Sequence, residues 1–167
     1  IAPRIAQYAP AARTCAFGLY AKMNDELLRQ SGFDLTIDGE FEEELVAWTL
    51  GQPSLRGEGP GRVVFRAPSR DRLLPLDCYA TLRHKDQDLR VGFVTSSRGC
   101  KHTCRHCPVV PVYQGKFRVV PVDIVLADIE AQVDAGAEHI SFGDPDFLNG
   151  PRHAIRIAAE VGTRWPD

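Results

Sequence analysis

A strand-then-helix pattern that occurs twice between residues 90 and 161 constrains the fold of this chain more than any other feature. Arg90–Thr95 is typical of a strand, and a helix is expected from Pro121 to its C-terminal stop at Gly136. The apolar stripe of this helix consists of Val122, Val125, Leu126, Ile129 and Val133. A second strand over Glu138–Phe142 and a second helix over Pro151–Val161 follow. Two such units in series are the building block of a parallel barrel or a doubly wound sheet.

The first fifty residues show a similar but shorter order. Residues 13–19 are typical of a short buried strand, and residues 33–37 alternate as a second strand should. Between them, a helix is expected from an N-cap at Asn24 to Gly32. A further helix over residues 40–50 would bury Phe41, Leu45 and Trp48 and leave Glu42, Glu43 and Glu44 largely outside. This order predicts part of a parallel sheet covered by helices.

We expect three segments: a domain piece over residues 1–50, a linker over 51–89, and a second domain piece over 90–167. The linker is rich in Gly, Pro and Arg, with one short strand expected at Arg62–Arg66. The composition, 44% hydrophobic and 25% charged, is that of a globular protein. No apolar run approaches the length of a membrane span, so we expect no membrane association.

Three of the five cysteines lie within eight residues, as Cys100-x3-Cys104-x2-Cys107. Three thiolates at this spacing can ligate three irons of one [4Fe–4S] cluster and leave the fourth iron open. An open metal position is typical of catalytic sites. The other two cysteines, Cys15 and Cys78, are isolated, and we expect structural roles for both. Five is an odd number of cysteines and three of them are clustered, which does not suit disulfides and favours a reducing, cytoplasmic setting.

Other uses of these cysteines stay open on the residues alone. A structural zinc site is the main alternative, because His102 and His106 lie nearby and zinc accepts three cysteines and a histidine. A redox pair of Cys104 and Cys107 would leave Cys100 without a role. An iron–sulfur protein that only transfers electrons would use the same ligands.

Charge is distributed unevenly along the chain. Residues 51–120 hold 13 Lys and Arg against 5 Asp and Glu, whereas the segments before and after them are acidic. The basic stretch 98–118 is consistent with a solvated loop, a docking face for a reductant, or a lid. Aromatic and basic residues do not alternate as in single-strand binders, so we do not expect a nucleic-acid partner.

Cys100-x3-Cys104-x2-Cys107 after a strand, in a chain of strand–helix units, resembles the radical S-adenosylmethionine (SAM) superfamily. The strand-end segment from Ile140 to Phe147 lies where such enzymes carry a glycine-rich, acidic turn. Residues 113–118 and the helix after Pro121 resemble the branch in which a B12-binding Rossmann-like domain precedes the barrel. Residues 13–50 are similar to the later part of that B12-type domain. The connector Asp71–Tyr79 and the run from Gly99 to Pro151 most resemble the subgroup named for a CUAEP or CCAEP C-terminal tail.

The resemblance implies an α/β fold: the C-terminal part of a Rossmann-like B12-binding-type domain, then the first β/α units of a radical SAM partial TIM barrel. It implies an enzyme that binds a [4Fe–4S] cluster and SAM and cleaves SAM reductively to a 5′-deoxyadenosyl radical, with cobalamin as a candidate third cofactor. Cys100, Cys104 and Cys107 would be the iron ligands. The SAM-binding residues would be His106, Gly143, Asp144, Pro145 and Asp146, with Asp144 and Asp146 as candidates for the SAM ammonium group.

Three departures from the family pattern stand out. His106 occupies a position that is usually Tyr or Phe, and Gly143-Asp144-Pro145-Asp146 replaces a Gly-Gly-Glu type of turn. The cobalt-ligand pattern Asp-x-His-x-x-Gly does not occur, which leaves cobalamin open. We expect an unidentified small-molecule or peptide substrate and an electron donor such as flavodoxin or ferredoxin. Since a barrel needs more β/α units than the two that this chain supplies, we also expect a fragment that is inactive by itself and has an unpaired sheet edge.

Overall fold

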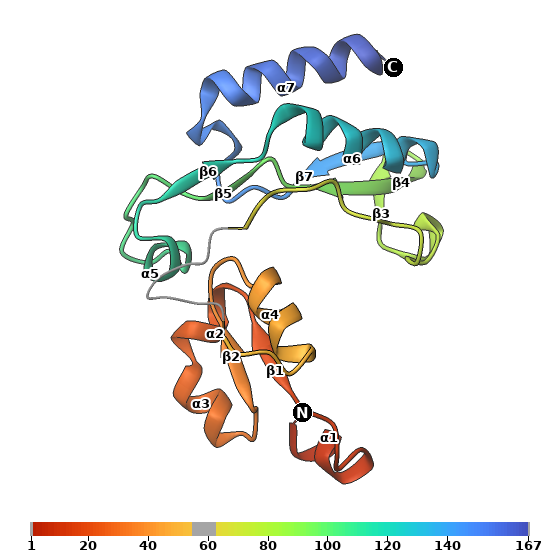
Figure 1. Cartoon of the computed structure of the whole chain (residues 1–167). Helices are drawn as coiled ribbons and strands as arrows, with labels where there is room; N and C mark the ends of the chain where they lie inside the picture. Colours follow the sequence, from red (N-terminus) through yellow and green to blue (C-terminus); the bar gives the residue numbers. More distant parts are fainter. Residues whose placement is uncertain (1, 55–62, 167) are drawn as a thin grey trace. The chain divides into compact units, whose positions relative to one another are not determined.

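The computed structural model describes residues 2–54 and 63–166, and the chain divides into two compact units (Figure 1). The first unit comprises Ile1–Val64 and His102–Gly115, and the second comprises Phe65–Lys101 and Lys116–Asp167. The chain therefore passes from the second unit to the first inside the cysteine loop, between Cys100 and Cys104. Among the helices of the described residues, none is long and apolar enough to cross a membrane.

The first unit holds a two-stranded parallel sheet with short helices around it. In chain order its elements are α1 (Ala2–Tyr8), β1 (Cys15–Phe17), α2 (Leu19–Met23), α3 (Asp25–Gln30), β2 (Leu35–Ile37), α4 (Glu42–Thr49) and α5 (Val109–Tyr113). The strands pair from Cys15 opposite Leu35 to Phe17 opposite Ile37, which confirms the predicted parallel order. The carboxylate of Asp34 accepts hydrogen bonds from the backbone N–H of Thr14 (2.6 Å) and from its hydroxyl (3.0 Å). These bonds hold the sheet together at its first residues.

Strand β1 is shorter and less buried than predicted. It ends at Phe17, and Leu19 already begins α2, a helix that the sequence analysis did not predict. Phe17 is 51% exposed, and its ring contacts that of Phe41 at a centroid separation of 4.3 Å. The expectation of a buried strand was therefore wrong for Phe17.

Asn24 is the N-cap residue of α3, as predicted, but its side chain makes no capping hydrogen bond. Its amide instead donates to the carbonyl of Tyr20 (2.8 Å), in the first turn of α2. In α4 the buried residues are Glu44 and Ala47. The expectation that Glu44 lies outside was therefore wrong. Trp48 lies partly exposed under the Arg13 guanidinium, 4.1 Å from the ring centroid.

The second unit holds a three-stranded sheet, a two-stranded ribbon and two long helices. Its elements are η1 (Leu76–Cys78), β3 (Thr81–His84), β4 (Gln87–Val94), β5 (Ser97–Gly99), β6 (Phe117–Val119), α6 (Val122–Asp134), β7 (His139–Phe142), η2 (Phe147–Asn149) and α7 (Pro151–Arg164). The sheet order is β3-β4-β7, with β3 antiparallel and β7 parallel to β4. Within the described residues β7 pairs only with β4, so it is an edge strand, as expected.

Helix α6 lies between the sheet and α7, and contacts both β4 and α7 (Figure 1). The core of the unit is the cluster Val94, Val120, Val125, Ile129 and Ile157, which includes two members of the predicted stripe. Val122 and Val133 pack against the same cluster, and Leu126 is 3% exposed, so the predicted stripe is confirmed. Gly136 follows the helix with φ +92°, a left-handed conformation that suits glycine.

A buried polar contact joins α6 to the sheet. Gln132 is 1% exposed, and its carbonyl oxygen accepts from the N–H of Phe93 (2.7 Å) while its amide donates to the carbonyl of Phe93 (3.3 Å). Strand β3 pairs with β4 only as far as Arg90, so these backbone groups lie beyond the hairpin. Gln132 thus supplies hydrogen bonds that a neighbouring strand would otherwise make.

Two regions expected to be irregular contain regular structure. Within residues 51–89, β3 and the start of β4 form a hairpin that turns at Lys85, where φ is +53°. Between the cysteines and Val120, a chain expected to be extended forms α5, which buries Val109, Val112 and Tyr113 at helical spacing. Of the strand expected at Arg62–Arg66, Arg62 lies outside the described residues, and residues 63–66 are not in a strand.

Candidate functional site

The carboxyl ends of β4 and β7 lie side by side in the second unit. The two strands are parallel, from Val91 opposite His139 to Val94 opposite Phe142. The N–H of Gly143 then donates to the carbonyl of Val94 (2.8 Å), which extends the pairing by one residue. The segment that leads into the cysteine loop and the segment Gly143–Asp146 therefore leave the sheet at the same edge. In α/β folds this edge is where ligands and reacting groups gather.

Position 143 has room for glycine but not for a larger residue. A Cβ atom at this position would lie 1.9 Å from Cζ of the Phe93 ring and less than 3 Å from two further ring atoms. Phe93 belongs to β4, directly beside β7. The sequence analysis proposed Gly143 as a SAM-binding residue, and in the structure its missing side chain makes room for this ring.

Asp144 links the end of β7 to the segment after β4 through hydrogen bonds. Its carboxylate accepts from the backbone N–H of Ser96 (3.0 Å), from the Ser96 hydroxyl (2.9 Å) and, in a very short contact, from the Ser97 hydroxyl. Both serines are buried, at 1% and 3% exposure. Three donors in a poorly hydrated place make this carboxylate a structural link at the strand ends.

Asp146 closes the turn that follows. It occupies the cap of η2, and its carboxylate accepts from the N–H of Leu148 (3.1 Å) and from the side-chain amide of Asn149 (3.1 Å). Pro145 lies exposed between the two aspartates. Both aspartates therefore already accept hydrogen bonds, Asp144 from the segment after β4 and Asp146 from η2, and their predicted contact with an amine stays a prediction.

Asn149 is a residue that the sequence analysis missed. It is 8% exposed, its Oδ1 accepts from the backbone N–H of Lys101 (2.9 Å), and its Nδ2 donates to Sγ of Cys100 (3.5 Å). The Lys101 ammonium group also donates to the backbone carbonyl of Asn149 (2.9 Å). The first cysteine of the loop is thereby attached to the turn after β7. The only signal in the sequence was a polar residue before Gly150, which is typical of an ordinary turn.

Cys104 and Cys107 belong to the first unit. The N–H of Cys107 donates to the carbonyl of Cys104 (3.3 Å), and the carbonyl of Cys107 accepts from Val110 at the start of α5 (3.2 Å). Cys104 and His106 are exposed and Cys107 is half-buried. The turn lines a cavity of about 370 Å³ together with Tyr20, Met23, Pro108 and neighbouring residues of the same unit. The structure leaves the predicted stacking role of His106 untested.

The residues of the loop suit an iron–sulfur cluster by their chemistry. In the described part of the chain none of these three cysteines forms a disulfide, and none is fully buried. Thiolates are the ligands that such clusters use. Within residues 2–54 and 63–166, no three His, Cys, Asp or Glu side chains converge on a common metal position. The donor set fits the group, and its assembly around a metal stays a prediction.

The two remaining cysteines lie elsewhere. Cys15 is in β1, where burial raises the pKa of its thiol, and Cys78 is exposed in η1. The burial of Cys15 agrees with the structural role expected for it, whereas the exposure of Cys78 does not suggest one. Cys78 is therefore a suitable control in experiments on the loop.

Positive side chains in the second unit stack on aromatic rings beside the β5–β6 ribbon. The guanidinium groups of Arg98 and Arg118 lie 5.4 Å and 4.6 Å from the centroid of Phe65, and the Lys101 ammonium lies 5.0 Å from that of Phe117. Such contacts attract a cation to a ring face. They hold the basic side chains of this ribbon in defined positions.

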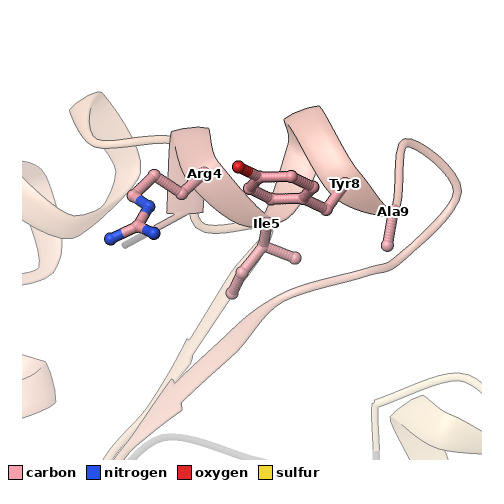
Figure 2. Close-up of a pocket in the computed structure, with 4 residues that line it drawn as sticks. All are labelled: Arg4, Ile5, Tyr8 and Ala9. Carbon is pink, nitrogen blue, oxygen red and sulfur yellow. The ribbon is translucent and has the colours of Figure 1, made fainter.

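Two other cavities, both lined by described residues, lie away from the predicted site residues. One of about 430 Å³ lies at α1, where Figure 2 shows Arg4, Ile5, Tyr8 and Ala9. Another, of about 660 Å³, lies in the second unit between η1, β4 and α6, with a mainly apolar lining that includes Leu73, Tyr79 and Phe93. Neither brings together side chains suited to catalysis.

The chain is similar to known proteins in part of its sequence and in its fold. No protein-family model matches the chain. Two curated proteins, from Clavibacter michiganensis subsp. michiganensis (strain NCPPB 382) and Clavibacter sepedonicus, are each 37% identical over 62 residues. Both are described as tRNA-2-methylthio-N(6)-dimethylallyladenosine synthase. The match covers 37% of this chain, and the chain spans 12% of the length of these relatives.

Two solved structures of the radical S-adenosylmethionine methyltransferase TsrM from Kitasatospora setae have a similar fold. One contains tryptophan substrate and a SAM analogue, and the other contains cobalamin and a [4Fe–4S] cluster. The TM-scores are 0.60 and 0.61 at 18% identity, over 92% of this chain and 33% and 34% of TsrM. The likeness confirms the predicted α/β fold class.

Proposed function

We propose that this chain contributes the cluster-binding and SAM-binding segments of a radical SAM enzyme. One observation carries the proposal: the start of a three-cysteine loop lies against an acidic turn at the carboxyl ends of two adjacent parallel strands. Asp144 bonded to Ser96 and Ser97, and Asn149 bonded to Cys100 and Lys101, make that connection. The similarity in fold to TsrM, whose structures contain a [4Fe–4S] cluster and a SAM analogue, supports it.

In this proposal Cys100, Cys104 and Cys107 hold three irons, and the fourth iron is left for the amino and carboxylate groups of SAM. When bound, the cluster supplies the electron that cleaves SAM to a 5′-deoxyadenosyl radical. The chain's own residues bind and orient the cofactors. The basic side chains around the loop, among them Lys101 and Arg105, would offset the negative charge of the thiolate-bound cluster.

The turn Gly143–Asp146 would bind the methionine end of SAM. An ionised carboxylate has about four acceptor sites, and the hydrogen bonds from Ser96 and Ser97 use three of those at Asp144. Asp144 therefore retains capacity for an ammonium group, and Asp146, the second candidate, lies in the same turn. His106, exposed in the loop, would contact the adenine. An electron donor of the flavodoxin or ferredoxin type completes the proposal, and cobalamin is its candidate third cofactor.

The substrate is not assigned. The curated relatives are described as acting on a tRNA nucleoside, and TsrM was solved with tryptophan. These are chemically different molecules, so they do not narrow the choice. A small molecule or a peptide stays our expectation.

The test is anaerobic reconstitution of the chain with iron and sulfide, followed by measurement of iron and sulfide per chain. Alanine variants of Cys100, Cys104 and Cys107 should each lose the cluster, because two thiolates hold it poorly. Cys78→Ala, at an exposed cysteine outside the loop, is the matched control and should retain it. Zinc uptake without sulfide, or loop variants that bind as much iron as the control, would contradict the proposal.

A further inference from the structure

Asn149 is buried and hydrogen-bonded at both ends of its side chain, whereas an ordinary turn residue is exposed. It is 8% exposed at the end of η2, and both ends of its side-chain amide are hydrogen-bonded. Its partners come from two segments 48 and 3 residues away, Lys101 in the cysteine loop and Asp146 in the acidic turn. A polar side chain buried between two such segments fixes their separation.

The orientation of this amide is determined by its partners. The backbone N–H of Lys101 can only donate, so it must face the oxygen of Asn149. The carboxylate of Asp146 accepts, so it must face the nitrogen. The same nitrogen lies 3.5 Å from Sγ of Cys100 and is therefore directed at the sulfur as a donor.

A hydrogen bond to a ligand sulfur affects the cluster that the sulfur binds. It stabilises the more negative, reduced state and so raises the reduction potential, and groups behind the ligands orient them as well. Asn149 therefore combines two actions on one cysteine: it holds the backbone next to Cys100 and donates to its sulfur.

We propose that Asn149 is the positioning residue of the cysteine loop, holding Cys100 against the acidic turn and tuning the potential of the cluster through its hydrogen bond to the Cys100 sulfur. The inference rests on the proposed function. It concerns a residue that does not itself bind the metal. It implies that Cys100 and the acidic turn keep a fixed separation.

Two variants separate the actions of Asn149. Asn149→Ala removes the acceptor for Lys101 and the donor to Cys100. The double exchange Asp146→Asn with Asn149→Asp keeps an acceptor for Lys101, keeps an amide–carboxylate pair between positions 146 and 149, and conserves net charge. It replaces the donor to sulfur by a carboxylate oxygen and moves the negative charge of position 146 to position 149, while the side-chain oxygen of Asn at position 146 can still accept from the N–H of Leu148. Asn24→Ala is the matched control, because Asn24 is the other asparagine of the chain and bonds only within the first unit.

Two measurements are made on the full chain. Hydrogen exchange of the metal-free protein reports on the Lys101 amide, and electron paramagnetic resonance during a redox titration with titanium(III) citrate reports the potential of the reconstituted cluster. We expect Asn149→Ala to speed exchange at Lys101 by about fivefold, the effect of one hydrogen bond, and the double exchange to leave it unchanged. Both should lower the potential, and Asn24→Ala should change neither quantity.

The inference is overturned if both variants show the wild-type potential, or if Asn149→Ala leaves exchange at Lys101 unchanged. A wild-type chain that takes up no iron and sulfide refutes the proposed function and the tuning role with it. In that case the exchange at Lys101 still decides whether Asn149 holds the loop. The two failures are therefore distinguishable.

Discussion

Replacing Asp144 by alanine should destabilise the second unit more than any other single change in the acidic turn. The substitution removes the common acceptor of three donors: the N–H of Ser96 and the hydroxyls of Ser96 and Ser97. Because both serines are at most 3% exposed, water cannot readily replace the carboxylate. The strand ends that carry the cysteine loop and the turn would lose their main polar connection.

The size of the effect follows from these contacts. A buried donor left without a partner costs about 1–3 kcal/mol, and hydrogen bonds to a charged group are at the upper end. The two hydroxyls can rotate toward other acceptors, whereas the backbone N–H cannot. We therefore expect Asp144→Ala to lower the free energy of unfolding by about 3–5 kcal/mol. Ser97→Ala removes one donor and leaves the carboxylate two others, so it should cost about 1 kcal/mol.

Urea unfolding of the metal-free chain measures this difference. In a Trp48→Phe background Trp165, which packs against the core of the second unit, is the remaining tryptophan and reports on that unit. Asp134→Ala, at an exposed carboxylate of α6, is the control. An Asp144→Ala variant whose midpoint and slope match those of the control would refute the reasoning that Asp144 joins the strand ends.

Three further predictions concern the same sheet. Gly143→Ala should cost about 1–3 kcal/mol in urea unfolding, because its Cβ would lie 1.9 Å from the Phe93 ring; adding Phe93→Leu should recover part of the loss, and no recovery would contradict the clash. Gln132→Leu should cost about 1–3 kcal/mol and speed hydrogen exchange of the Phe93 amide, whose acceptor it removes; wild-type exchange would contradict that role. The hydrogen bonds that Glu138 accepts from the backbone N–H and then the side chain of Arg90 lower the pKa of this carboxyl below its ordinary 4.5. Its contribution to stability is thus complete above pH 4.5 and is lost as pH falls through the lowered value, so the stability difference between wild type and Glu138→Gln should shrink on acidification, and a difference that is constant with pH would be the contrary result.

The regular elements of the second unit could be predicted because their patterns are long. Helix α6 has thirteen residues with an apolar stripe and a glycine stop, and β4 and β7 carry apolar residues at alternate positions, namely Leu89, Val91 and Phe93 in β4 and Ile140 and Phe142 in β7. The elements that were missed are short. Helix α5 has five residues and contains Pro111, and β3 is exposed throughout. Short elements depend on tertiary contacts more than on local preference.

The candidate site was predictable in its residue types and less so in its connections. Cysteine spacing predicted the donors of the loop, which stay a prediction, and strand order placed the acidic turn at the correct edge of the sheet. The sequence did not indicate that Asp144 would bond to Ser96 and Ser97, since a Gly-Asp-Pro run is equally typical of a plain turn. Asn149 could not be found, because partners 48 residues away leave no local signal.

The most direct test of the central claim, that the cysteine loop holds a cluster with an iron open to SAM, is electron paramagnetic resonance of the reconstituted, reduced chain with and without SAM. We predict a [4Fe–4S]⁺ signal whose g-values shift when SAM is added, because the amino and carboxylate groups of SAM would bind the iron that lacks a cysteine. A cluster signal that is identical with and without SAM would contradict the account and favour an electron-transfer role for the loop.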